Sequence, residues 1–279
     1  MELWTGLFVL CAAAMHASWN AVVKNAVDSL VMQALIILTA ALIALPFALA
    51  LPFPGPETWG YILAGTIVHG FYFAFLVKAY EIGDFSHVYP ISRGTGPMVV
   101  AVFAATFLGE ALTIAQYAGV ALVSLGVLSL ALTAPGAGGT RALRYALTVG
   151  LTIATYTVID GLGSRSGPEP FSFIAWLLVL SVVPIGGLAL WRRGPGAAIA
   201  AARAQLFRGL AAGTVCGLAY TIVLWAYSEG ALATVAALRE TSVIFAALIG
   251  AILFGEPFGR RRTLAAAIVA AGVVAINLG

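Results

Sequence analysis

The chain has 279 residues, of which 62% are apolar and only 9% are charged, whereas about 25% are charged in an ordinary globular domain. So little charge excludes a soluble domain, a disordered chain and a secreted disulfide scaffold. The formal net charge of +3, from 14 basic and 11 acidic residues, is too small for a nucleic-acid-binding surface. Cys11 and Cys216 lie in apolar runs without metal-ligand spacing, and we expect both to be buried packing residues.

A membrane-spanning helix needs about 20 predominantly apolar residues, and the sequence contains ten such runs separated by proline, glycine or charge. They lie approximately at 3–23, 30–51, 58–78, 86–109, 112–132, 142–162, 171–190, 207–228, 231–254 and 263–278. We therefore expect an all-α membrane protein with ten transmembrane helices. The first run lacks a basic n-region and is too long for a cleavable signal peptide, so we expect it to stay as the first helix.

The second half of the chain repeats landmarks of the first half at a nearly constant offset. The sequence AYEIG at 79–83 returns as AYSEG at 226–230, shifted by 147 residues. The triplet at 93–95 (RGT) returns at 239–241 (RET), shifted by 146. Such ordered matches indicate an internal duplication.

Each half contains five spans, and an odd number makes the second half enter the membrane from the opposite side. We expect a first five-helix repeat at 1–133, a linker at 134–141 and a second, inverted five-helix repeat at 142–279. Inverted repeats are typical of secondary transporters, whose substrate site lies near the midplane between the halves. A duplicated bundle without a transport role is the alternative.

Each half also carries a Gly-Glu pair at the end of its fourth span, Gly109-Glu110 and Gly255-Glu256. With ten spans in two fives, the whole chain resembles the drug/metabolite transporter superfamily, and within it the ten-helix EamA-type branch that includes bacterial exporters of amino acids, aromatic ones among them. The resemblance implies a secondary transporter of the inner membrane. We interpret the Gly-Glu pairs as structural markers of helix ends rather than substrate ligands.

The distribution of basic residues predicts the orientation. Apart from Arg93 and Arg239, eleven of the twelve remaining Lys and Arg residues fall on the side of loops 1–2, 3–4, 5–6, 7–8 and 9–10, and only Arg165 falls on the other. The positive-inside rule makes the crowded side cytoplasmic. Both termini then lie outside, although many relatives in the superfamily are thought to keep theirs inside.

Arg93 and Arg239 lie about eight residues into the fourth and ninth spans, which at about 1.5 Å per residue places them roughly 12 Å deep from opposite faces. A charge at that depth costs roughly 2.5–3.5 kcal/mol, so we expect both to face a central cavity. Guanidinium groups suit carboxylate or phosphate oxygens. The alternative is a structural role, with Arg239 paired to Glu240 or Arg93 capping carbonyls near Asp84.

Two further patterns concern the walls of this cavity. Around Arg93, the sequence SRGTGP at 92–97 predicts a broken helix that lines the cavity, because Pro97 removes a backbone hydrogen bond and the glycines add flexibility. A plain kink for packing is the alternative. The other deep polar and aromatic candidates for substrate binding are His16, Trp19, Asn20, His69, Tyr72, Tyr156, Asp160 and Glu240. Inter-helical hydrogen bonding or packing is the alternative role for each.

Several aromatic and basic side chains near span ends have simpler interpretations. Tyr80, Tyr89 and Tyr227 are expected at the membrane interface, and Tyr220 is one more aromatic of the eighth span. Lys78 is a candidate gating residue, with snorkelling to the interface as the alternative.

These features together predict a secondary transporter that exports amino acids or similar small metabolites by alternating access. An organic anion such as a phosphonate or carboxylate is the alternative substrate. No catalytic, nucleotide-binding or metal-binding motif is present, so we expect no enzyme, cofactor, metal or nucleic-acid partner. Ten spans complete a cavity alone, so a monomer would suffice. The rivals are a lipid-modifying enzyme that uses His16 or Asp160, a sensor subunit and, less favoured, a channel.

Overall fold

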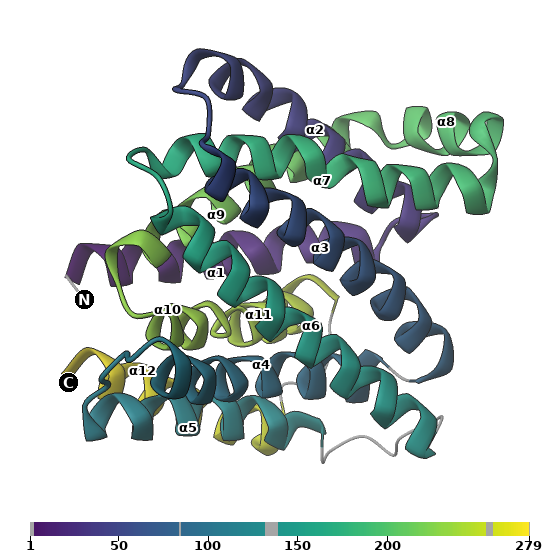
Figure 1. Ribbon diagram of the computed structural model, residues 1–279. Helices are drawn as coiled ribbons and strands as arrows, with labels where there is room; N and C mark the ends of the chain where they lie inside the picture. The colour runs from purple at the N-terminus through teal and green to yellow at the C-terminus, as the bar shows by residue number, and fades with distance from the viewer. Residues whose placement is uncertain (1–2, 84, 132–138, 255–258, 279) are drawn as a thin grey trace.

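The computed structural model describes residues 3–83, 85–131, 139–254 and 259–278, and within them the chain is helical without any strand (Figure 1). The helices are α1 (Leu3–Lys24), α2 (Ser29–Ala50), α3 (Pro56–Ile82), α4 (Phe85–Phe107), α5 (Ile114–Ala131), α6 (Gly139–Arg165), α7 (Pro170–Arg193), α8 (Pro195–Ala204), α9 (Leu206–Glu229), α10 (Leu232–Arg239), α11 (Ser242–Phe254) and α12 (Arg260–Leu278).

Six of these helices, α1, α2, α3, α6, α7 and α9, are long and apolar enough to cross a membrane. Helices α5 and α12 contain shorter apolar segments. Helix α3 presents Leu63, Ile67 and Phe71 on one stripe, each more than half exposed. Such an apolar stripe is suited to lipid. The chain is a multi-pass membrane protein, and the count of ten spans stays a prediction.

The helix ends follow local sequence signals. Asp28 caps α2, and its carboxylate accepts hydrogen bonds from the amides of Leu30 and Val31. The turn from α7 into α8 passes through Gly194 at φ 75°, a left-handed conformation that favours glycine. The short helix α8, in the predicted loop between spans seven and eight, was not expected from the sequence.

The helix contacts come in pairs that match the sequence repeat. Helix α3 packs on α6 and α7, and its counterpart α9 packs on α1 and α2. Helix α4 contacts α6, as α10 and α11 contact α1. The counterparts α2 and α7 lie side by side near the top of Figure 1, and α5 and α12 near the bottom. This exchange of contacts fits a two-repeat architecture.

Glycines bring the backbones of α5 and α12 together. A Cβ added at Gly119 would lie 2.7 Å from the carbonyl oxygen of Gly272, and one at Gly272 would lie 2.8 Å from that of Gly119. Small residues at such crossings allow the close packing that holds helices together in lipid, where burial of apolar surface gives no net gain.

Two sequence expectations about the fold are wrong. The break expected around Arg93 is absent, because helix α4 is continuous from Phe85 to Phe107 with Pro90 and Pro97 inside it; the alternative, a kink, stays a prediction. The break lies in the other half, where Glu240 and Thr241 separate α10 from α11. Cys11 is exposed, although Cys216 is buried as expected, because the side of α1 that carries Cys11 is not covered by other helices.

Candidate functional site

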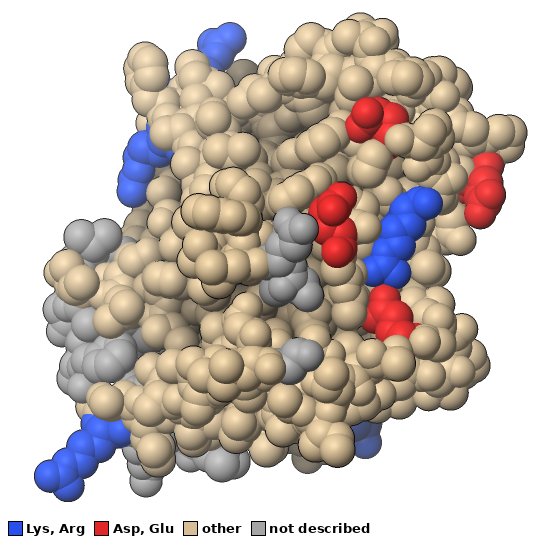
Figure 2. Space-filling view, turned by 90° about the vertical axis from the view of Figure 1, so that its left-hand side faces the viewer, with Lys and Arg blue, Asp and Glu red and all other residues tan. Residues whose placement is uncertain are grey.

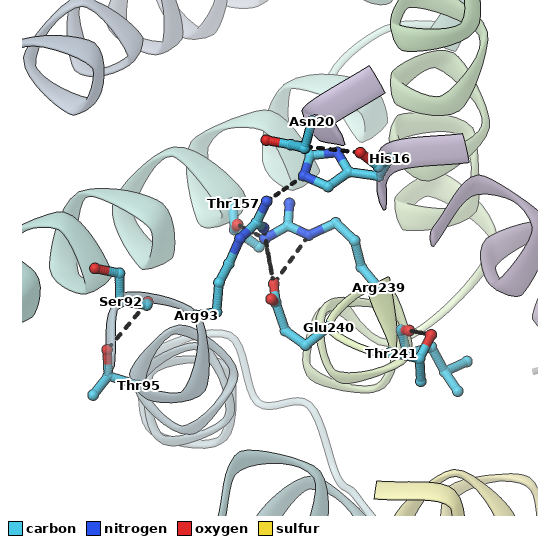
Figure 3. Close-up of polar contacts among 10 residues, drawn as sticks. His16, Asn20, Ser92, Arg93, Thr95, Thr157, Arg239, Glu240 and Thr241 are labelled. Carbon is cyan, nitrogen blue, oxygen red and sulfur yellow. Dashed lines mark hydrogen bonds and ion pairs between the residues drawn. The ribbon is translucent and has the colours of Figure 1, made fainter. Parts of the chain in front are cut away.

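Two buried arginines, one from each half of the chain, meet at a single carboxylate. Nη1 of Arg93 lies 3.3 Å from Oε1 of Glu240. Nε and Nη2 of Arg239 lie 3.3 and 3.2 Å from the same oxygen. Figure 3 shows both guanidinium groups side by side above Glu240. The side chain of Glu240 is completely buried, and its Oε2 has no hydrogen-bond partner among the described residues.

Two neighbours complete what we call the arginine cluster (His16, Arg93, Thr157, Arg239 and Glu240). Nη2 of Arg239 donates to Oγ1 of Thr157 at 3.5 Å, and Nη2 of Arg93 contacts Nε2 of His16. A guanidinium group has only donors, so Nε2 of His16 must be the acceptor. Its imidazole is therefore neutral and carries its proton on Nδ1.

The break between α10 and α11 positions Arg239 and Glu240. The amide of Glu240 donates to the carbonyl of Ala237, and Oγ1 of Thr241 donates to the carbonyl of Leu238. These bonds satisfy carbonyl groups at the end of α10, as broken helices at membrane depth require. The turn therefore lets one short segment present a cation and an anion to the interior.

Helix α4 is fixed against α6 next to Arg93. The hydroxyl of Ser92 donates to the carbonyl of Val88 in its own helix and to that of Ala146 in α6, at 2.9 and 3.0 Å. Gly150 of α6 lies directly against Thr95, where a Cβ would clash. Arg93 therefore projects from a helix whose position is set by close packing.

A second buried group, which we call the acid trio, consists of Asp160, Tyr220 and His69. The hydroxyl of Tyr220 lies 2.6 Å from Oδ2 of Asp160 and 3.0 Å from Nε2 of His69. Nε2 of His69 is 3.7 Å from the same carboxylate oxygen. Oδ1 of Asp160 has no hydrogen-bond partner among the described residues. The trio joins α3, α6 and α9.

Tyr156 lies between the two buried groups. Its ring stacks on the imidazole of His69, with 4.4 Å between ring centroids, and its centroid lies 5.8 Å from Cζ of Arg239. Tyr72 meets the ring of Tyr156 edge to face at 5.5 Å. The ring of Tyr156 therefore connects the arginine cluster with the acid trio.

The remaining predicted site residues lie at the edge of the arginine cluster or outside it. Trp19 meets His16 edge to face at 4.8 Å but packs among Met32, Ile36, Ala212 and Cys216. The amide of Asn20 donates to the carbonyl of His16 within α1. Lys78 pairs with Glu81 at 2.9 Å, and both side chains are more than 40% exposed.

The structure also changes the interpretation of two tyrosines. Tyr227, expected at the interface, is one of the largest fully buried side chains, because the end of α9 packs inside the bundle. Tyr220 belongs to the acid trio, although no role was predicted for it. The side chains of Tyr80 and Tyr89, like Asp84, lie outside the described residues.

The Gly-Glu pair of the first half closes one end of the molecule. Oε2 of Glu110 accepts from the amide of Leu232, at the start of α10, at 3.0 Å, and Oε1 lies 3.0 Å from Nη1 of Arg165. Arg165 also donates to the carbonyls of Tyr227 and Gly230. Figure 2 faces this end and shows acidic side chains gathered around a basic one. Glu256 of the second pair is outside the described residues.

The comparisons with known proteins agree with this architecture. The sequence profile of the EamA-like transporter family matches residues 3–132 and again residues 140–278. A solved structure titled "Crystal structure of protein" superposes with a TM-score of 0.76 at 16% identity and covers 100% of this chain and 99% of that one. At that identity the likeness shows the fold alone. A search of curated proteins finds no match.

The family match identifies a membrane transporter of small molecules, and the apolar helices around buried charge agree with it. Because the family profile covers almost the whole chain, once in each half, the protein belongs to the EamA-like transporter family. Members of this family are transporters and not enzymes, which agrees with the lack of a catalytic motif in the sequence.

Proposed function

We propose that this transporter exports amino acids, aromatic ones among them, or similar small metabolites that carry a carboxylate, across the inner membrane. The observation that carries the proposal is the meeting of Arg93 and Arg239, one from each half of the chain, at one oxygen of Glu240. Two positive groups and one negative group share this buried place. A substrate carboxylate would bring the second negative charge.

The geometry of Arg239 supports binding of a planar anion. Its Nε and Nη2 are directed at Glu240, and no dashed line in Figure 3 reaches the third nitrogen of its guanidinium group, Nη1. A guanidinium group offers donors in a fixed plane, which suits a carboxylate better than the ammonium of lysine does. A carboxylate near Nη1 would therefore gain a charge-assisted hydrogen bond in a place with little water.

The surrounding rings favour a substrate with an apolar or aromatic side chain. Tyr156 lies beside Arg239, Tyr72 lies beside Tyr156, and Trp19 lies beside His16. Ring faces attract both other rings and an ammonium group. An amino acid would present its carboxylate to the arginines and its side chain or ammonium to these rings.

A second candidate substrate is an organic anion, such as a phosphonate or a carboxylate without an ammonium group. It is favoured by the same excess of arginine over glutamate at the cluster. In both cases, the two five-helix halves at 1–133 and 142–279 would rock about the cluster to give alternating access. We propose that the loop side rich in Lys and Arg is cytoplasmic.

The test is a counterflow screen with labelled amino acids and organic anions in proteoliposomes. We expect saturable exchange of an amino acid, reduced at least about tenfold in Arg239→Gln, which corresponds to about 1.4 kcal/mol of binding free energy. Arg144→Gln is the matched control, because Arg144 is exposed on α6 away from the cluster. Equal orientation and a single elution peak must be shown for both variants.

Different results separate the rival functions. Exchange of organic anions but not amino acids would select the second candidate. No saturable exchange of any compound would contradict a carrier of these substrates. Full exchange in both Arg93→Ala and Arg239→Gln at wild-type density would remove the arginines from the mechanism. Mass spectrometry of incubated lipids would reveal a lipid-modifying enzyme.

A further inference from the structure

We infer that the acid trio is a proton-binding site, separate from the arginine cluster, and that it carries one proton opposite to the exported substrate in each transport cycle. The transport part of this inference rests on the proposed function, whereas the proton site itself follows from the hydrogen-bonding groups of Asp160, Tyr220 and His69.

The tautomer of His69 is fixed by its own helix. Nδ1 lies 2.8 Å from the carbonyl oxygen of Gly65, and a carbonyl oxygen can only accept a hydrogen bond. Nδ1 therefore carries a hydrogen. In the neutral imidazole, Nε2 is then an acceptor, and this is the nitrogen that faces Tyr220.

Without an additional proton, the trio has too few donors. Tyr220 has one hydroxyl hydrogen and two acceptors in reach, Oδ2 of Asp160 at 2.6 Å and Nε2 of His69 at 3.0 Å. If the hydrogen points to Asp160, the lone pair of Nε2 faces a lone pair of the phenol oxygen. If it points to His69, the phenol oxygen faces a carboxylate oxygen. In either orientation, one of the two contacts of the Tyr220 hydroxyl stays unsatisfied. The trio also keeps a net negative charge, which is buried.

One additional proton satisfies both contacts of the Tyr220 hydroxyl in two ways, as an ion pair or as a neutral pair. On His69, it lets Nε2 donate to Tyr220, which donates to the Asp160 carboxylate. On Asp160, it lets the carboxyl group donate to Tyr220, which donates to Nε2. Both arrangements leave the trio with no net charge, so burial favours them. The proton enters from one side of the membrane and leaves to the other, and no other bond forms or breaks.

The acid trio is closely packed, which favours a proton over a larger ligand at this site. Asp160 is packed against α3 so closely that a Cβ at Gly65 would lie 2.8 Å from Oδ1, and Leu177 of α7 lies beside the same glycine. Among the described residues, the other titratable or charged groups around the trio are Tyr156 of α6, stacked on His69, Arg239 of α10, next to Tyr156, and Tyr227 of α9, which interacts electrostatically with Asp160.

The same arrangement gives a physical path for coupling. Arg239 lies beside Tyr156, Tyr156 stacks on His69, and His69 belongs to the trio. A change of charge or position at the arginine cluster therefore reaches the trio through a single ring. The helices of the trio, α3, α6 and α9, come from both halves of the chain, so rocking of the halves would alter its access to water.

The first experiment measures the proton site in purified protein without substrate. Infrared difference spectra during a pH titration should show the signals of a buried carboxyl group and an imidazole titrating together, as one proton. Asp160→Asn should lose the carboxyl signal, and Glu57→Gln, at an exposed carboxylate of α3, should keep it. A wild-type spectrum in which no buried carboxyl or imidazole signal changes would overturn the inference.

The second experiment measures coupling in proteoliposomes. An imposed pH gradient should accelerate accumulation of the counterflow substrate at least about fivefold in wild type and in Glu57→Gln. Asp160→Asn should lose this acceleration, so that its rates of accumulation with and without the gradient are equal. Acceleration that persists in Asp160→Asn would overturn the inference. A wild-type rate of accumulation that does not change with the pH gradient would also overturn it.

The two experiments separate failure of the proton site from failure of the proposed function. If no amino acid or organic anion is exchanged but the titration shows the coupled proton, the proposed substrates are wrong and the proton site stands. If exchange is found but the titration and the gradient have no effect, the proton site is wrong and the transporter is a facilitator. Tyr220→Phe, which keeps both titrating groups but removes the bridge, should make the carboxyl and imidazole titrate independently.

Discussion

The arginine cluster and the acid trio are both buried and both built from the two halves of the chain, but they differ in charge. The arginine cluster holds two guanidinium groups around one carboxylate, Glu240, and the trio holds one carboxylate with a phenol and an imidazole. A guanidinium group stays charged in proteins, whereas a carboxyl group and an imidazole both titrate. The arginine cluster therefore suits a partner with a permanent negative charge, and the acid trio suits an exchangeable proton.

The largest effect should come from Glu240→Gln. This substitution leaves two buried guanidinium groups without their shared carboxylate, and breaking a buried ion pair from one side costs about 3–5 kcal/mol. We expect a large drop in the thermal unfolding temperature in detergent.

Asp160→Asn should be much less destabilising, because asparagine can still accept a hydrogen bond from Tyr220 and carries no charge. Equal losses of stability in Glu240→Gln and Asp160→Asn would contradict the distinction between a fixed and an exchangeable charge. Glu229→Gln, at an exposed residue at the end of α9, is the control for removal of a carboxylate.

The next effect should come from Arg239→Lys, which keeps the charge but replaces the planar group. Lysine cannot reproduce the contacts of Nε and Nη2 with Glu240 and Thr157. Hydrogen bonds to charged groups contribute about 1.5–3 kcal/mol each, so we expect the apparent substrate affinity to fall about tenfold in counterflow. Wild-type affinity in this variant would mean that only charge, and not planar geometry, matters at the cluster.

A smaller effect on stability is expected from Tyr220→Phe. It removes the hydroxyl group that bridges Asp160 and His69 and leaves both without that partner, at a cost of about 1–3 kcal/mol. Thermal unfolding of the purified protein measures the loss. Tyr117→Phe, on an exposed face of α5, should have no effect, and a similar loss in both variants would argue against a special role of the bridge.

The smallest effect should come from an exposed ionic group at the surface. A hydrogen bond from Lys78, with a further contribution from Arg192, lowers the pKa of Glu81 below its ordinary value of 4.5. A lowered carboxyl pKa stabilises the fold above that ordinary value, and the gain disappears as the pH falls through the lowered pKa. Because the pair is exposed, the gain should be well below about 1 kcal/mol.

Unfolding temperatures at pH 7 and pH 3.5 measure this contribution. Glu81→Gln should lower the unfolding temperature slightly at pH 7, and the difference from wild type should shrink at pH 3.5. A difference that grows on acidification would contradict the sign of the pKa shift.

Much of the architecture follows from the sequence, because hydropathy and the offset of 146–147 residues depend only on residue order. The depth of Arg93 and Arg239, together with the high cost of placing charge in lipid, predicted two interior arginines. The sequence does not reveal that both meet the same oxygen of Glu240, because this depends on the turn at the end of α10.

Other parts of the site could not be predicted because they depend on packing between distant helices. Thr157 and Tyr220 are ordinary residues in their own spans, and only the crossing of α6, α9 and α10 makes them partners of Arg239 and Asp160. The expected break around Arg93 is absent because Ser92 and Gly150 fix α4 against α6. Local helix-breaking residues permit a break without requiring one.

The contrast between a continuous α4 and a divided α10–α11 has a consequence for the transport cycle. If inverted halves exchange their conformations when access switches sides, the opposite-facing state has the broken helix in the first half and the continuous helix in the second. Pro90, Gly94 and Pro97 would then serve as a hinge where the helix is continuous in one half of the cycle and broken in the other. The prolines inside α4 would thus serve the opposite-facing conformation, in which the helix is broken at these residues.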